Sequence, residues 1–232
     1  MESCELKIIL VTVSGMHQWG INWPYISGGG LKHNYQLVQF HIHWSQMNEN
    51  GSEHTINGKH YPAEIHLLHI KAGQSMNDSL HQKDGIAVVS LLLNIGFNPT
   101  PLSSLDGALR TMLLRFNKGR PATIHAFRPH SLLPLNTESF YRYEGSLTTP
   151  GCEESVIWTI LSEPVSMTNI QLAQLRGTRL SVGSEIKDNT RPIQPLNGRS
   201  VLFNSSKKHS FNFCDPANPL VKAFGQKFCQ FK

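Results

Sequence analysis

The sequence lacks any long hydrophobic run, because no stretch of its 232 residues approaches the about 18 apolar residues that cross a membrane as a helix. Charged residues are also scarce, at 16% against 39% hydrophobic ones, which excludes a disordered, highly charged chain. Lys and Arg number 21 and Asp and Glu 16, but this excess of positive charge is spread along the chain. We therefore expect no transmembrane span and no nucleic-acid partner.

Cysteine is scarce, and its spacing excludes a cysteine-based metal site. The four cysteines are far apart and form no C-x-x-C pair; they are Cys4, Cys152, Cys214 and Cys229. Four cysteines allow three complete pairings, and the sequence leaves the pairing open. The H-E-x-x-H motif of zinc peptidases is absent as well, which disfavours that class of hydrolase.

Signals for the cellular compartment point in two directions. Residues 8–13 form an apolar run of only six residues that follows Glu2 and Glu5, so they make a poor signal peptide. Three N-glycosylation sequons favour secretion only weakly, because such triplets often arise by chance; they begin at Asn50, Asn77 and Asn204. The sequence alone therefore leaves the compartment open.

The pattern of apolar residues predicts one strand-rich domain with a few helices. Strand-like runs occupy residues 35–44, 63–70, 86–93, 142–149 and 155–161. The run 86–93 is continuously apolar, which indicates a strand buried on both faces, although a buried helix fits the same pattern. Helical spacing predicts helices over 104–117 and 169–175, and prolines predict an extended segment over 188–199.

Histidine is the residue present in excess, with 12 copies, of which eight cluster between residues 33 and 81. His41 and His43 are two apart on a predicted strand, so their side chains point to the same face. If the strand over 63–70 is its neighbour, His66 converges on them, whereas His69 points to the opposite face. Three neutral imidazoles with an open fourth position are typical of a catalytic zinc site.

Two polar residues share a face with these candidate ligands. Gln39 lies two residues before His41, and Glu64 lies two residues before His66. Because zinc-bound histidines usually donate their second ring N–H to an amide, carboxylate or carbonyl, we expect Gln39 to bond His41 and Glu64 to bond His66. We expect His43 to use a backbone carbonyl near Asn189. The alternative is that these are ordinary polar residues of a core or surface.

Five separated blocks of the sequence resemble the α-class carbonic anhydrases in order and spacing. The blocks are QFHIHW (39–44), GSEHTI (51–56), AEIHLLH (63–69), GSLTTP (145–150) and DNTRPIQPLNGR (188–199). The resemblance implies a mostly β fold with short helices, built as a single domain around a central, twisted, mainly antiparallel sheet. It assigns the domain to 26–205, with 1–25 as an unmatched lead-in and 206–232 as a tail.

The resemblance also implies a function, the zinc-dependent reversible hydration of carbon dioxide to bicarbonate and a proton. His41, His43 and His66 match the histidines that bind Zn2+. Thr148 matches the threonine that accepts a hydrogen bond from the zinc-bound hydroxide and donates its own proton to a glutamate, here Glu53. The remaining matches form the substrate pocket: Thr149 beside the substrate, and an apolar wall of Leu68, Val88, Leu147, Val156 and Trp158.

The N-terminal region departs from the family pattern. Family members carry several tens more residues before the GGGL block (28–31), including the usual proton-shuttle histidine. A non-catalytic carbonic-anhydrase-like binding protein, or an inactive shortened product, is therefore the alternative function.

Within the family, the sequence resembles most closely the extracellular, membrane-associated branch. The features that carry this resemblance are Cys152, the residues HWS (43–45) and the 188–199 block. In that branch the partner of Cys152 lies in the stretch that is missing here, so Cys152 is either unpaired or bonded to Cys4. We expect the extracellular or cell-surface secretory route, with the cytoplasm as the alternative.

Overall fold

The structure is a computed structural model that describes residues 13–14, 23–97, 99–114, 128–177 and 188–205. Its strands are β1 (Val13–Ser14), β2 (Tyr25–Ile26), β3 (Tyr35–Trp44), β4 (Ala63–Lys71), β5 (Ile86–Ile95), β6 (Phe140–Gly145), β7 (Val156–Leu161), β8 (Val165–Met167) and β9 (Leu202–Asn204). Its helices are α1 (Met76–Leu80), α2 (Asp106–Leu114) and α3 (Asn169–Arg176), with 3-10 turns η1 (Asn48–Asn50), η2 (Pro101–Leu105) and η3 (Pro129–Leu132).

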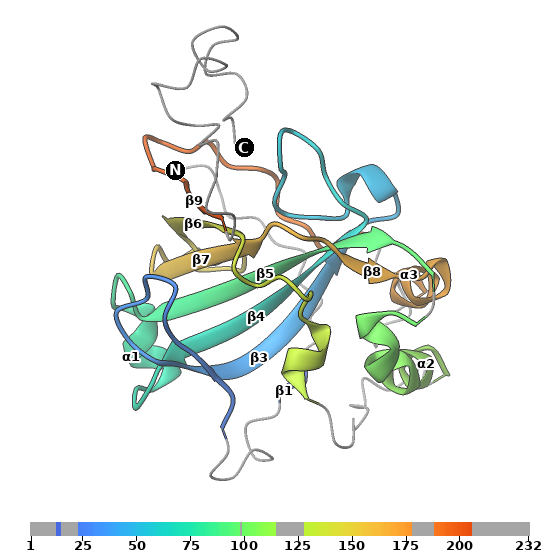
Figure 1. Cartoon of the computed structure of the whole chain (residues 1–232), viewed down its shortest axis with the longest axis horizontal. Coiled ribbons are helices and arrows are strands. Elements are labelled where there is room, and N and C mark those ends of the chain that lie inside the picture. Colours follow the sequence, from blue (N-terminus) through green and yellow to red (C-terminus); the bar gives the residue numbers. More distant parts are fainter. Residues whose placement is uncertain (1–12, 15–22, 98, 115–127, 178–187, 206–232) are drawn as a thin grey trace, which may run out of the picture.

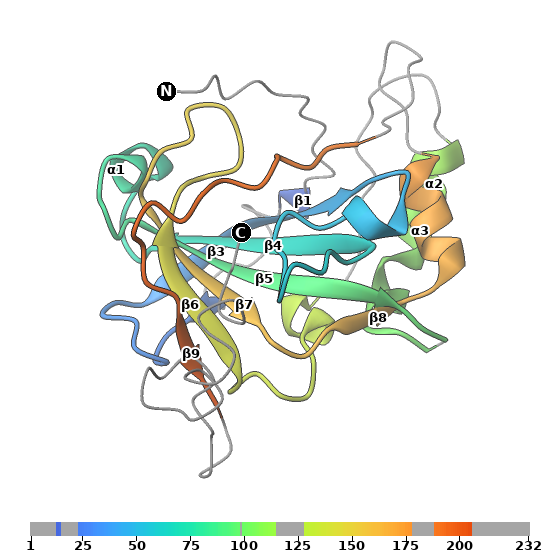
Figure 2. The same ribbon diagram turned by 90° about the horizontal axis from the view of Figure 1, so that it is seen from above.

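One curled sheet organises the fold. The strand order is β1-β3-β4-β5-β7-β6-β9, with β2 also pairing with β3 and β8 with β5 (Figure 1). All pairs are antiparallel except β5–β7 and β5–β8, which are parallel. In the view from above, β6 and β9 run steeply across β3, β4 and β5, which shows how strongly the sheet twists (Figure 2). The predicted fold class is therefore confirmed.

The alternation along β3 separates the core from the site. Phe40, Ile42 and Trp44 point into the larger apolar cluster, which the helices α2 and α3 join through Leu109 and Leu172. The intervening residues His41 and His43 therefore lie on the opposite face of the sheet, as the strand period requires. The partner strand β4 carries the third histidine, and β5 is buried on both faces along most of its length, as predicted.

The two predicted helices lie where the pattern placed them: α2 begins two residues after the predicted start at 104, and α3 matches the prediction over 169–175 within one residue. They lie side by side at one end of the sheet (Figures 1 and 2). Thr168 begins α3 with a capping box, in which its side chain accepts from Gln171 N and the Gln171 side chain bonds back to the cap. Among the described residues, no helix has the length and hydrophobicity needed to cross a membrane.

One strand prediction was wrong in part, because the segment 142–149 does not remain extended to its end. The strand β6 ends at Gly145, and a compact loop follows. Leu147 N donates to Glu153 O over 3.0 Å, and Cys152 N donates to Thr149 O over 3.0 Å. Gly151 (φ +101°) and Cys152 (φ +47°) occupy the left-handed region, so the chain reverses here instead of pairing.

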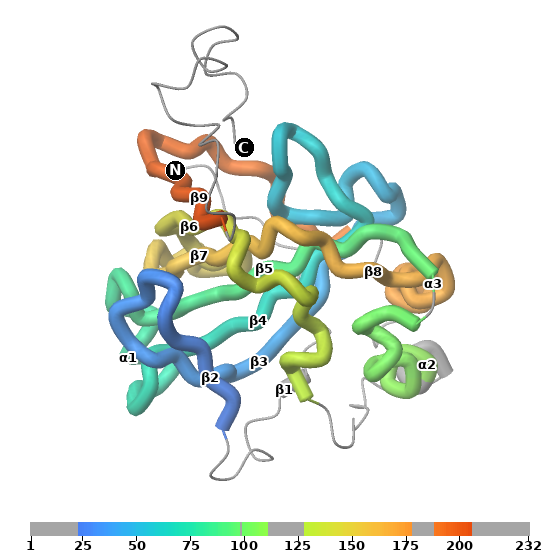
Figure 3. Tube along the Cα trace, viewed as in Figure 1, coloured from blue at the N-terminus to red at the C-terminus, as the bar shows by residue number. Residues whose placement is uncertain are grey.

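The extended segment predicted over 188–199 is present and leads on to residue 205, so that this part of the chain crosses from the end of β3 to the far edge of the sheet. It begins at Asp188, which bridges to Ser45 just after β3, and it ends in β9 beside β6. Figure 3 shows this path from orange to red. The segment thus contacts His43 through Asn189 and Glu53 through Arg191. The predicted lead-in (1–25) and tail (206–232) lie largely outside the described residues.

Candidate metal centre

The three predicted histidines come together on neighbouring strands. His41 of β3 lies directly opposite His66 of β4, and His43 is two residues along β3. One ring nitrogen of each histidine lies within 4.8 Å of those of the other two. All three side chains are buried, with relative exposures of 6%, 6% and 1%. This arrangement matches a mononuclear metal site with three imidazole ligands.

The protonation and bonding of these rings suit a divalent metal. Burial lowers the pKa of His41, of His43 and of His66, which keeps the imidazoles neutral. Nε2 of His43 and both ring nitrogens of His41 are buried without a hydrogen-bond partner. Neutral imidazole nitrogens that are buried and unbonded are the ligand atoms that zinc prefers, so the residues present fit the ion.

His66 is oriented by Glu64, as predicted. Its Nε2 lies 2.7 Å from Glu64 Oε1, which leaves Nδ1 to face the other two histidines. The Ser90 hydroxyl donates to the same carboxylate oxygen over 2.6 Å, and His54 N donates to Oε2 over 2.8 Å. Burial alone would raise the pKa of Glu64, but the neighbouring His54 and His66 hold it well below its usual range. An ionised carboxylate therefore supports this ligand.

His43 is oriented by Asn189, also as predicted. Its Nδ1–H donates to Asn189 O over 2.8 Å, so Nε2 is the atom left for a metal. The Asn189 side chain binds the open edge of β3: Trp44 N donates to Oδ1 over 2.7 Å, and Nδ2 donates to Ile42 O over 2.9 Å. One residue therefore fixes both the ligand and the strand that carries it.

The expected bond between Gln39 and His41 was wrong for this structure. Gln39 Oε1 and both nitrogens of His41 are buried without a hydrogen-bond partner, although the two residues line the same cavity. The pairing of β3 with β4 shifts register between Leu37 and Gln39. A bulge of this kind re-aims nearby side chains, which the simple alternation used for the prediction does not capture.

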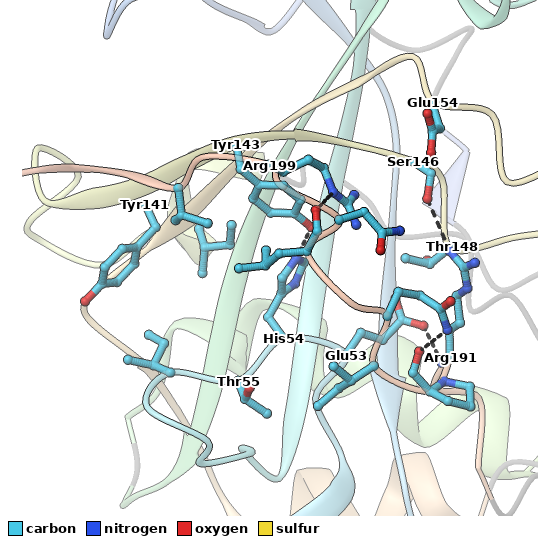
Figure 4. Close-up of a pocket in the computed structure, with 18 residues that line it drawn as sticks. Glu53, His54, Thr55, Tyr141, Tyr143, Ser146, Thr148, Glu154, Arg191 and Arg199 are labelled. Carbon is cyan, nitrogen blue, oxygen red and sulfur yellow. Dashed lines mark hydrogen bonds between the residues drawn. The ribbon is translucent and has the colours of Figure 1, made fainter. Parts of the chain in front are cut away.

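His54 and Tyr143 extend the ligand network and were missed by the sequence analysis. His54 Nδ1–H donates to Glu64 Oε1 over 2.6 Å, and His54 Nε2 lies 2.7 Å from the Tyr143 hydroxyl (Figure 4). Burial raises the pKa of Tyr143, so its hydroxyl stays protonated and able to donate. A chain of polar groups thus runs from Tyr143 through His54 and Glu64 to His66.

Glu53 lies beside the histidines and is tied to the extended segment. Arg191 N donates to Glu53 Oε1 over 2.7 Å, and Arg191 Nη1 donates to Ser146 Oγ over 3.2 Å (Figure 4). Burial raises the pKa of Glu53 to about 7, an effect that the nearby His66 and the Thr148 hydroxyl partly oppose. Oε2 of Glu53 has no hydrogen-bond partner, so the predicted hydrogen bond from Thr148 to this oxygen is not formed. The Thr148 hydroxyl is nevertheless near enough to lower the pKa of the carboxyl.

A cavity of about 250 Å³ opens from the histidines toward the surface. Five predicted substrate residues line it: Leu68, Val88, Leu147, Thr149 and Trp158. The predicted wall residue Val156 is not among the lining residues; it is buried in the apolar cluster that includes Trp158 and Leu68. Met76, Leu80 and Glu153 also line the cavity and were not predicted.

A curled mixed sheet with three converging, neutral histidines, two of which line a small, largely apolar cavity, defines a mononuclear metalloprotein of the catalytic-zinc type. The family model for eukaryotic-type carbonic anhydrases matches residues 8–205. The chain belongs to the eukaryotic-type carbonic anhydrase family.

Several similar proteins support this assignment. The chain is 43% identical over 200 residues to "Putative carbonic anhydrase 5" and 41% identical over 179 residues to "Putative carbonic anhydrase 3", both of Caenorhabditis elegans. It is 40% identical over 187 residues to "Carbonic anhydrase 1" of Mus musculus. These matches cover 86%, 77% and 78% of this chain, but only 64%, 68% and 70% of the respective relatives. The chain thus spans about two thirds of the length of these relatives.

Proposed function

We propose that this chain catalyses the reversible hydration of carbon dioxide to bicarbonate and a proton, with a zinc ion held by His41, His43 and His66. The observation that carries the proposal is the convergence of three buried, neutral imidazoles, two of which, His41 and His66, line a cavity with apolar walls. Zinc in such a site lowers the pKa of a bound water to about 7 and so makes hydroxide available at neutral pH.

The residues around the metal position have separable roles. Thr148 lines the cavity, and the Glu53 carboxylate lies behind it. When the Thr148 hydroxyl donates to Glu53, its oxygen can only accept a hydrogen bond from a group in the cavity, which orients that group. Leu68, Val88 and Trp158 offer a carbon dioxide molecule a wall without hydrogen-bonding demands. This wall suits an uncharged substrate that has no donors.

A non-catalytic binding protein is the alternative, and the site argues against it. All three candidate ligands are present and buried, and two of them are held by the expected partners, Glu64 and Asn189. A protein that only binds a partner has no need for neutral, unbonded imidazole nitrogens at the base of a cavity.

The test is a carbon dioxide hydration assay on the full chain after zinc loading, beside His66→Ala as the matched control. We expect hydration by the wild-type chain that disappears after chelation and returns with zinc, and no zinc-dependent hydration by His66→Ala. A folded, zinc-loaded wild-type chain without hydration activity would overturn the enzymatic proposal and favour the binding protein.

We further propose that the chain follows the secretory route, like the extracellular branch that its sequence resembles. Cys152 is disulfide-bonded, to a partner outside the described residues, and disulfides are typical of secreted and extracellular proteins. The sequon asparagines Asn50, Asn77 and Asn204 are exposed, which supports access for glycosylation.

Expression of the full chain in animal cells tests this route. We expect a mobility shift on treatment with a glycosidase that removes N-linked glycans, and the shift should shrink in Asn77→Gln. A chain retained in the cytosol without any glycan would contradict the proposal.

A further inference from the structure

The cavity that leads to the histidines carries a carboxylate on its wall. Glu153 lies on the loop after β6, and its side chain lines the cavity together with Thr148, Thr149 and Trp158. The loop is held by the bond from Leu147 N to Glu153 O over 3.0 Å and by the disulfide-bonded Cys152. The position of the side chain is therefore set by the same loop that presents the two threonines.

Gly151 allows the carboxylate to fold against this loop. A Cβ atom at residue 151 would collide with the carboxylate of Glu153, and the φ of +101° at Gly151 favours glycine in any case. The carboxylate therefore packs over the backbone of Gly151 instead of extending freely into solvent. This contact holds the negative charge near the wall of the cavity.

The charge of Glu153 is not neutralised by the part of the protein that the structure describes. No Lys, Arg or His side chain there lies within ion-pair distance of Glu153. The cavity lining, within the same residues, contains no Lys or Arg. An anion that enters the cavity thus meets one uncompensated negative charge.

We propose that Glu153 is a specificity-determining residue that lowers the affinity of the site for anions relative to neutral molecules. The inference rests on the proposed function, in which the substrate, carbon dioxide, is neutral and the product, bicarbonate, is a monoanion. A fixed negative charge on the wall leaves the neutral substrate unaffected and raises the free energy of a bound anion. Glu153 therefore favours release of bicarbonate and protects the site against inhibitory anions.

Glu154 offers a matched control. It follows Glu153 directly but lines a different pocket, the one that contains Arg191 and Tyr143 (Figure 4). Glu153→Gln and Glu154→Gln remove the same charge from adjacent residues with almost no change of shape. The difference between the two variants isolates the charge that faces the histidine cavity.

The experiment uses the full chain loaded with cobalt(II) in place of zinc, and thiocyanate as the probe anion. The visible absorption of the cobalt ion reports the binding of thiocyanate, so the readout does not depend on catalysis. At low ionic strength and one fixed pH, we expect Glu153→Gln to bind thiocyanate about three- to tenfold more tightly than the wild type, as one charge acting across a partly solvated cavity produces. Glu154→Gln should stay within about twofold of the wild type, because its charge lies outside the cavity and is screened.

Salt provides a second measurement. The ratio of the wild-type and Glu153→Gln dissociation constants should approach one as ionic strength rises to about 1 M, where the screening length falls to about 3 Å. An unchanged dissociation constant in cobalt-loaded Glu153→Gln, or an equal effect in Glu154→Gln, would overturn this inference alone. A wild-type chain that binds no cobalt would refute the metal site itself, and this inference with it.

Discussion

Glu64 is the residue on which the ligand network converges. Its fully buried carboxylate accepts hydrogen bonds from His66, His54 and Ser90, and it connects a candidate metal ligand to Tyr143 through His54. A carboxylate bonded to the second nitrogen of a ligand histidine fixes its tautomer and raises its basicity. The affinity of the site for metal therefore depends on Glu64 as well as on the three ligands.

We predict that Glu64→Ala weakens zinc binding by about 10- to 100-fold, because His66 loses the acceptor that orients it. Competition with a chromogenic chelator measures this affinity, and circular dichroism checks that the variant remains folded. Glu64→Gln retains an acceptor oxygen and should lose less. Equal zinc affinity of Glu64→Ala and the wild type would show that Glu64 does not orient the ligand.

His69 makes stability depend on pH in the acidic range. Burial lowers its pKa from the ordinary value of about 6.5 to about 4, and its Nδ1–H donates to Ala87 O over 3.2 Å. Between these values the unfolded chain binds the proton and the folded chain does not. Stability is thus fully present above about pH 6.5 and is lost as the pH falls toward 4, by up to about 3 kcal/mol from this residue.

We predict that the free energy of unfolding falls less steeply between pH 6.5 and about 4.5 in His69→Gln than in the wild type, both without metal. Urea unfolding at several pH values measures the slope. His81→Gln, which removes an exposed histidine, should keep the wild-type slope. Parallel slopes for His69→Gln and the wild type would contradict the buried, neutral state of His69.

The ligand histidines and two of their partners could be predicted from the sequence, because strand alternation and the family blocks both place them. The roles of Ser90 and Tyr143 could not be predicted in this way. Their contacts depend on how β5 and β6 pair with their neighbours, and the alternation of residues along one strand does not reveal that register. A signal for Ser90 was present: it is the one polar residue in an otherwise apolar run, and a buried hydroxyl needs a partner.

At the scale of the element, β3 has a side on which the described strands pair with only part of its main chain. It pairs with β4 along its length on one side, but on the other side β1 and β2 cover only short stretches near its start and middle. The Asn189 side chain bonds the main chain at Ile42 and Trp44, on the side of β3 where no described strand pairs with these two residues. This contact satisfies buried backbone groups beside the ligand His43.

We predict that Asn189→Ala lowers the free energy of unfolding by about 1–3 kcal/mol, because Trp44 N and Ile42 O lose their partners. Zinc affinity should fall as well, since His43 lies on the part of β3 that the Asn189 side chain no longer holds. Urea unfolding and chelator competition measure the two effects. Asn94→Ala, at an exposed site on β5, is the control and should change neither. The account of the strand edge fails if the two variants behave alike.

Element positions were more predictable than element ends. The strands over 35–44, 63–70 and 155–161 and the helix over 169–175 match the structure within one residue at each end. The strand predicted over 142–149 ends at Gly145 instead, because its turn depends on left-handed residues at 151 and 152, beyond the apolar run. The bulge near Gln39 could not be predicted from the sequence for a similar reason, because it depends on the pairing of β3 with β4.

At the scale of the molecule, the described residues offer few groups that could carry a proton away from the metal site. Apart from the two ligands His41 and His66, the only titratable side chain that lines the cavity within the described residues is Glu153. A proton leaves slowly near neutral pH unless a group of similar pKa is within reach, and imidazole has such a pKa. We therefore expect proton export to limit the turnover of the proposed reaction.

We predict that imidazole buffer raises kcat of the zinc-loaded chain in a concentration-dependent manner and leaves kcat/KM nearly unchanged. Initial rates of carbon dioxide hydration at constant pH and ionic strength measure both constants. A buffer too basic to exchange protons near pH 7 serves as the control. A kcat that is indifferent to imidazole would show that another group transfers the proton or that another step limits turnover.

The measurement that most directly tests the central claim is the zinc stoichiometry of the folded chain. Native mass spectrometry of the full-length protein after zinc loading and removal of excess metal gives this number directly. We predict one zinc ion per wild-type chain and none retained by His43→Ala, because three imidazoles define the site. A folded wild-type chain that retains no more zinc than His43→Ala would contradict the account.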